Sequence, residues 1–134
     1  MTTDKIDRDT ATQEFERWAE EMDLDLQCYT EEDEADLEKH RNRILREIRR
    51  GNATVDDNGI LQFTPSRSKV DDAIVFYEPT GATYQAIDGK KKGHDIKRQN
   101  AMLGDLTKQH PAVFAKLANS DFKFCQSVLA LFLA

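Results

Sequence analysis

Apolar residues recur every three or four positions early in the chain, which is the period of an amphipathic helix. Phe15, Trp18 and Met22 would fall on one face of a helix that runs from Thr10 to about Asp23. A threonine at the first position can cap such a helix by accepting a backbone hydrogen bond. The pattern therefore predicts a first helix with an aromatic and methionine face.

A second helix is predicted between Thr30 and Gly51. Its start carries acidic residues and its end carries arginines, which suits the two ends of the helix dipole. Glycine just after the last turn is a common helix stop. The apolar stripe of this helix consists of Leu37, Ile44, Leu45 and Ile48.

The period then changes to the alternation typical of strands. A hairpin is predicted from Ala53–Asp56 and Ile60–Thr64, with Asp57-Asn58-Gly59 as its turn, because asparagine and glycine both tolerate positive φ. The β-prone run Ala73–Tyr77 predicts another strand, and Pro79-Thr80-Gly81 a turn into a possible fourth strand, Thr83–Ile87. We expect a small, mostly antiparallel sheet of three to four strands.

Three short helices are expected in the last forty residues. The first runs from a cap at Asp95 to about Lys108, with Ile96, Met102, Leu103 and Leu106 inward. The second follows Pro111, a residue favoured in a first helical turn, and spans Ala112–Ala118. The third is capped by Ser120 or Asp121 and points these residues inward: Phe124, Cys125, Val128, Leu129, Phe132 and Leu133.

The predicted fold class is therefore α+β, with an N-terminal helical pair, a central sheet and a C-terminal helical cluster. We divide the chain into a charged helical arm or pair, residues 1–51, and an α+β module, residues 52–134. A length of 134 residues favours one domain to which the helical arm could be attached separately, and a chain of this size buries enough surface to fold without disulfides.

Composition points to a cytosolic protein. The two cysteines, Cys28 and Cys125, match no metal or redox spacing, and a secreted disulfide scaffold would hold more of them. The first residues are polar and acidic, unlike a signal peptide. The longest apolar run, Val128–Ala134, is far shorter than the roughly 20 residues of a membrane span.

Charge is strongly segregated within the net charge of −6. Residues 1–38 hold fifteen acidic and three basic side chains, whereas residues 39–50 hold six basic and one acidic. An acidic chain is a poor nucleic-acid binder, since neutralising phosphates dominates that affinity. Two basic stretches, Lys39–Arg50 and Lys90–Arg98, keep nucleic-acid binding open as a minor alternative.

Catalytic and metal-binding motifs are absent from the sequence. His40, His94 and His110 are isolated, and no HxH, HExxH or CxxC spacing occurs. Cys125 lies on the apolar stripe of the last helix, where a buried inert thiol is the common case. We therefore predict no enzyme activity, no cofactor and no metal.

Two apolar sets are candidates for contact with a partner protein. The first is Phe15, Trp18 and Met22, and the second is Leu129, Phe132 and Leu133. Packing in the core explains both sets. Aromatic and methionine side chains are also enriched at interfaces, so the alternative of an exposed docking face stays open.

The segment from Ile74 to Ala134 resembles the tail assembly chaperones of long-tailed bacteriophages. The matching stretches are Phe76–Gly81, Met102–Thr107, Val113–Leu117 and Asp121–Leu133. The resemblance implies a cytoplasmic protein of a phage or prophage that covers the tape measure protein during tail assembly. A longer, frameshifted form with an extra C-terminal domain that recruits tail tube protein is also implied, and this chain would be the shorter form.

The N-terminal helices lie outside the resemblance, so they could form a homo-oligomer interface or close over the client-binding face. The leading hypothesis is a non-enzymatic chaperone that buries apolar helical segments of its client. The alternative is a small phage or bacterial regulatory protein that binds nucleic acid, or mimics it through the acidic region Met1–Glu38.

Overall fold

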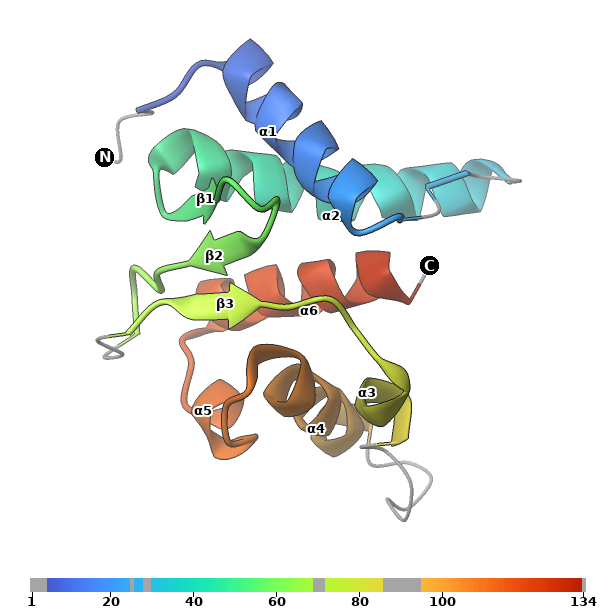
Figure 1. The fold of residues 1–134 in the computed structure, drawn as a ribbon, viewed down its shortest axis with the longest axis vertical. Helices are drawn as coiled ribbons and strands as arrows, with labels where there is room; N and C mark the ends of the chain where they lie inside the picture. The colour runs from blue at the N-terminus through green and yellow to red at the C-terminus, as the bar shows by residue number, and fades with distance from the viewer. Residues whose placement is uncertain (1–4, 25, 28–29, 69–71, 86–94, 134) are drawn as a thin grey trace.

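The computed structural model describes residues 5–24, 26–27, 30–68, 72–85 and 95–133 (Figure 1). The elements follow in the order α1 (Arg8–Glu21), α2 (Glu31–Arg50), β1 (Ala53–Val55), β2 (Leu61–Phe63), β3 (Ile74–Phe76), α3 (Gly81–Gln85), α4 (Asp95–Thr107), α5 (Ala112–Ala115) and α6 (Asn119–Phe132). The predicted α+β class is confirmed.

Local capping defines the ends of the two N-terminal helices. α1 begins earlier than predicted, because the carboxylate of Asp7 accepts a hydrogen bond from Thr10 N at 2.7 Å, so Asp7 and not Thr10 is its N-cap. α2 confirms its predicted bounds: Thr30 Oγ1 accepts from Asp33 N at 3.0 Å, and Gly51 closes the helix at φ 80°.

The sheet has three antiparallel strands in the order β1-β2-β3, with Ala53 opposite Phe63 and Leu61 opposite Phe76. The predicted hairpin is confirmed, although of its turn residues only Gly59 takes positive φ. Asp56 Oδ1 supports the turn by accepting from Asn58 N at 2.8 Å and from Ile60 N at 3.0 Å. Side chains at alternate strand positions are buried, as period two requires.

The predicted fourth strand, Thr83–Ile87, is wrong: Gly81–Gln85 form the short helix α3, and residues 86–87 lie outside the described residues. Thr83 Oγ1 donates to Asp105 Oδ2 at 2.7 Å and accepts from Thr80 N at 3.1 Å. These bonds stabilise a helical turn in a sequence whose composition alone favours a strand.

The C-terminal helices occur where the pattern placed them, with differences at their ends. α6 begins at Asn119 after Ala118, with no side-chain cap, so the predicted caps Ser120 and Asp121 are wrong. Ile96 on α4 is 53% exposed and not inward. The predicted cap at Asp95 concerns a side chain outside the described set.

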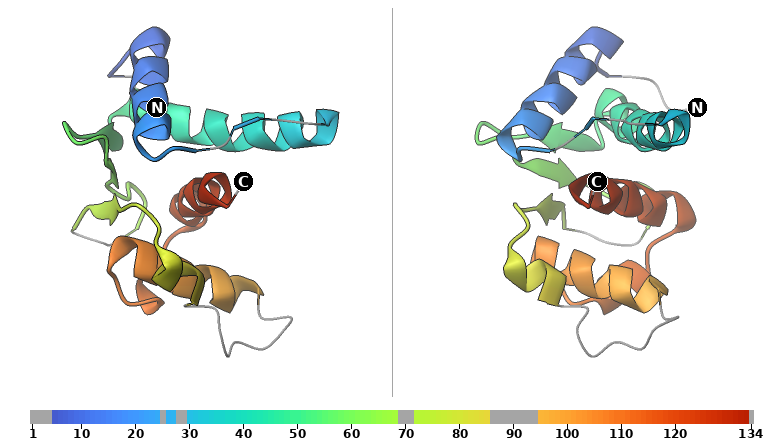
Figure 2. Two further views of the ribbon diagram at one scale, coloured as in Figure 1. Left: turned by 45° about the vertical axis from the view of Figure 1, so that its right-hand side comes forward. Right: turned by 90° about the vertical axis from the view of Figure 1, so that its right-hand side faces the viewer.

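The elements stack in three levels (Figure 1). α1 and α2 lie at one end, the sheet and α6 occupy the middle, and α3, α4 and α5 lie at the other end. α6 covers the sheet through Phe124, whose ring stacks on Phe63 with centroids 4.0 Å apart. The N-terminal half of α2 extends past the other elements (Figure 2).

Candidate functional site

A surface hollow of about 230 Å³ lies where the C-terminal ends of α1 and α6 meet the chain between β3 and α3. Its apolar lining consists of Met22, Leu24, Pro79, Tyr84 and Phe132, and its acidic residues are Asp23 and Glu78. We call these seven residues the apolar hollow after the five side chains named first, although most of the surface that the lining leaves open is polar. It combines apolar surface with negative charge, and this combination suits an apolar side chain that has a positive charge beside it.

The end of α1 positions one wall of the apolar hollow. Asp23 takes the left-handed conformation at φ 52°, which aspartate tolerates better than most residues. Asp23 N bonds to Glu20 O at 3.1 Å and Leu24 N to Ala19 O at 3.0 Å, so the helix closes and the chain turns. This turn places Leu24 beside Met22 in the lining.

The opposite wall is held by α3 and α4. Beyond β3, Tyr77 N donates to Leu106 O at 3.2 Å, which joins the chain after β3 to the end of α4. Thr80 caps α3 by accepting from Ala82 N at 3.2 Å, and the bond from Thr83 to Asp105 fixes α3 on α4. Tyr84, next along α3, lines the hollow and is 46% exposed.

The two predicted partner-binding sets meet at this place. The rings of Trp18 and Phe132 are in edge contact, with centroids 5.5 Å apart, and Met22 and Phe132 both line the hollow. Phe132 is half-buried and Leu133 is 48% exposed. Of the six predicted residues, Phe132 and Leu133 are therefore the ones with substantial surface.

The other four predicted residues pack inside the molecule. Phe15, Trp18, Met22 and Leu129 are all buried, and Trp18 is fully inaccessible. The core interpretation of these side chains therefore applies in this conformation. Met22 still lines the hollow, but none of the four offers an exposed face, because they belong to the buried core cluster.

Pattern reasoning missed Leu24, Pro79 and Tyr84. Leu24 and Pro79 lie in connectors, where no helical or strand period marks an apolar residue. Tyr84 was assigned to a strand that does not form. The Pro-Thr-Gly turn was the available signal, since it showed that the chain reverses direction close to Tyr84.

The structure also creates a serine–histidine pair that the sequence did not indicate. His40 Nδ1 lies 3.0 Å from Ser127 Oγ, and Arg43 Nη1 donates to the same oxygen at 3.0 Å. Burial, followed by the charges of Arg43 and Lys39, lowers the pKa of His40. Ser127 is completely buried, so its hydroxyl cannot reach a substrate, and the pair joins α2 to α6.

Among the residues that the structure describes, the remaining candidates for chemistry form no site. Burial and the nearby charge of Asp121 raise the pKa of the Cys125 thiol, which makes the reactive thiolate scarce. His110 is exposed and accepts from Ala112 N at 3.0 Å, whereas Cys28 and His94 lie outside the described residues. Within the described ranges no group of three His, Cys, Asp or Glu residues is arranged to hold a metal ion.

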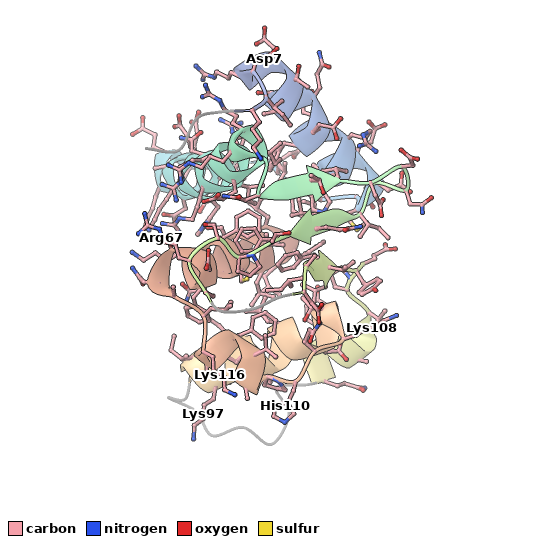
Figure 3. The ribbon with its side chains drawn as sticks, turned by 90° about the vertical axis from the view of Figure 1, so that its left-hand side faces the viewer. Asp7, Arg67, Lys97, Lys108, His110 and Lys116 are labelled. Carbon is pink, nitrogen blue, oxygen red and sulfur yellow. The ribbon has the colours of Figure 1, made fainter. Side chains whose placement is uncertain are left out.

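Basic side chains gather at the end of the molecule opposite to α1. Lys97, Lys108, His110 and Lys116 surround α4 and α5, far from Asp7 (Figure 3). Lys108 Nζ lies 4.3 Å from the centre of the Tyr77 ring, a cation–π contact. The predicted basic residues Lys90–Lys92 lie outside the described part of the chain.

None of the described helices is long and apolar enough to cross a membrane. A comparison with known protein families, curated protein sequences and solved structures finds no match to this chain.

Proposed function

We propose that this chain is a non-enzymatic tail assembly chaperone of a phage or prophage, which binds and solubilises the tape measure protein in the cytoplasm of the bacterial host. The observation that carries the proposal is the apolar hollow beside the exposed Leu133. The identity of the client is inferred from the resemblance of residues 74–134 to the chaperone family. The same resemblance implies tail tube protein as a further partner.

The mechanism is reversible burial of an apolar client segment. Tyr84 and Leu133 each keep nearly half of their surface exposed, and contact with a client would remove that surface from water. Burying half of a large apolar side chain contributes about 1 kcal/mol. Asp23 and Glu78 attract a lysine or arginine next to the client's apolar residue and disfavour acidic segments.

The test is co-expression of the tagged chain with the tape measure protein encoded nearby in the source genome. We expect a soluble complex that is captured through the tag. If the client stays insoluble and this chain elutes alone, the result contradicts the proposed function.

Surface variants locate the contact within the same assay. Tyr84→Asp combined with Leu133→Asp should weaken the complex roughly thirtyfold, since two half-buried anchors contribute about 2 kcal/mol. The matched control is Ile96→Asp, which changes another exposed apolar residue, 53% accessible, that does not line the hollow. Equal loss in the control and the double variant would place the client elsewhere.

A further inference from the structure

A groove separate from the apolar hollow follows the protruding half of α2. One part has a volume of about 430 Å³ and is lined by Leu26, Glu34, Leu37, Glu38 and Arg41. It continues into a hollow of about 450 Å³ between α1 and α2 that shares Leu26, Glu38 and Arg41. Leu26 and Leu37 are only partly buried, so the groove offers apolar surface along one side of the helix that extends from the body in Figure 2.

Three charged residues line this face, the acidic Glu34 and Glu38 and the basic Arg41. Glu34 and Arg41 are seven residues apart, which is about two helical turns, so both side chains project to the same side. Both are exposed. Within the part of the chain that the structure describes, neither forms an ion pair with another side chain. Leu37 lies between them.

This pattern is complementary to itself when the helix is reversed. In an antiparallel pair of α2 helices related by a twofold axis near Leu37, Glu34 of each copy faces Arg41 of the other. The two Leu37 side chains then meet at the centre. Glu38 of each copy lies beside them, and its repulsion from Glu38 of the other copy weakens the pair. A parallel pair would instead place Glu34 against Glu34 and Arg41 against Arg41, which is unfavourable.

We propose that a second copy of this chain docks in the groove, so that two α2 helices pair antiparallel across a twofold axis. The charges along the paired segment favour the same arrangement, because the acidic residues 31–36 approach residues 39–44 of the other copy, which include Lys39, Arg41 and Arg43. The pairing goes beyond client binding, since it uses residues outside the apolar hollow.

The dimer should be weak and reversible. The contact spans only a few helical turns, which belongs to the small interfaces of transient complexes. The net charge of −6 on each copy opposes association. We therefore expect a monomer–dimer equilibrium that sedimentation velocity resolves as the protein concentration rises to roughly 1 mM.

Charge reversal tests the pairing directly. Glu34→Arg places a second basic side chain against Arg41 of the other copy, and Arg41→Glu places two carboxylates together. Each repulsive contact occurs twice, because the dimer has twofold symmetry. Each single variant should weaken the dimer roughly tenfold. The double variant Glu34→Arg/Arg41→Glu restores opposite charges and should recover the dimer.

Mixing the two single variants gives the sharpest result. One copy then has two arginines and the other has two glutamates at these positions, so the heterodimer is complementary while both homodimers are not. Glu32→Arg is the matched control, because it changes the same charge in the same first turn but points away from the groove. Circular dichroism checks that every variant keeps its helix content.

A wild-type chain that stays monomeric at all these concentrations would overturn the proposal. So would a dimer that single reversals leave intact, or one that the Glu32→Arg control weakens as much as Glu34→Arg does. No client is present in these experiments, so their failure leaves the proposed chaperone function untouched.

Discussion

His40 is half-buried between α2 and α6, where its Nδ1 forms a hydrogen bond of 3.0 Å with Ser127 Oγ. Arg43 also donates to Ser127 Oγ, and the serine hydroxyl can donate its hydrogen to Nδ1 when the His40 ring is neutral. Burial, then Arg43 and Lys39, lower the pKa of His40, while Asp36 acts in the opposite direction. The neutral form is therefore the one that the fold favours.

This lowered pKa predicts a pH dependence of stability. Between the folded pKa and the ordinary value of 6.5, the unfolded chain binds more protons than the folded one, so the free energy of unfolding falls as pH drops through this window. Above pH 6.5, the contribution of the neutral His40 to the free energy of unfolding is fully present. Urea unfolding at about pH 7.5 and about pH 5.5 measures this change. The free energy of unfolding should fall more for the wild type than for His40→Gln, because glutamine keeps a polar group but cannot titrate. Equal losses would contradict the argument.

At the scale of elements, Asp121 joins the chain after β2 to the start of α6. Its carboxylate is 2% exposed and accepts from Arg67 N at 3.1 Å and from Ser68 Oγ at 2.6 Å. Ser68 Oγ in turn accepts from Ala118 N at 2.8 Å. One side chain therefore connects residues that are more than fifty positions apart.

Asp121→Ala should lower the free energy of unfolding by about 2–3 kcal/mol, because buried donors lose a charged acceptor. Asp72→Ala makes the same chemical change at an exposed position and should cost less than about 0.5 kcal/mol. Urea unfolding measures both values. Hydrogen exchange at the amide of Arg67 should accelerate only in the Asp121 variant, and unchanged exchange there would argue against the bond.

Arg17 is a second connection between elements. Its guanidinium donates to the backbone oxygens of Val55 and Asp56, and it pairs with Glu14 at 2.6 Å. The helical pattern places Arg17 on the outer face of α1, which is correct locally. The β1–β2 turn reaches Arg17 there, so a side chain that stays partly exposed also holds the hairpin.

At the scale of the whole molecule, the core joins both parts of the chain. The buried cluster includes Trp18 and Ile44 from the N-terminal helices together with Phe63, Phe124 and Leu131 from the remainder. α2 packs along α6, and Trp18 contacts Phe132. Removing the first helices would expose a large apolar face of α6 and of the sheet.

We therefore expect that a fragment of residues 52–134 does not fold by itself. It should lack the amide dispersion of a folded protein in an NMR spectrum and should bind a hydrophobic dye, since its apolar face has lost its cover. The full chain under the same conditions is the control. A fragment with dispersed amide signals and cooperative unfolding would show that the module is autonomous.

The sequence by itself determined the elements whose signals are local. The bounds of α2 follow from Thr30, Gly51 and the charges between them, and the hairpin follows from alternation and its turn. The shared face of Phe15, Trp18 and Met22 follows from helical period alone, whereas its burial is a property of the tertiary structure. Capping, turn chemistry and periodicity act between residues a few positions apart, so one sequence suffices to detect them.

Only the tertiary structure decided what depends on distant partners. α3 forms where the composition favours a strand because Asp105 accepts the Thr83 hydroxyl from another helix. Asp121 is a buried connection and not a helix cap, and His40 meets Ser127 across 87 positions. The apolar hollow likewise exists only because α1, α3 and α6 converge. Polar side chains carry no period that identifies their partners, so their roles follow from the packing of elements.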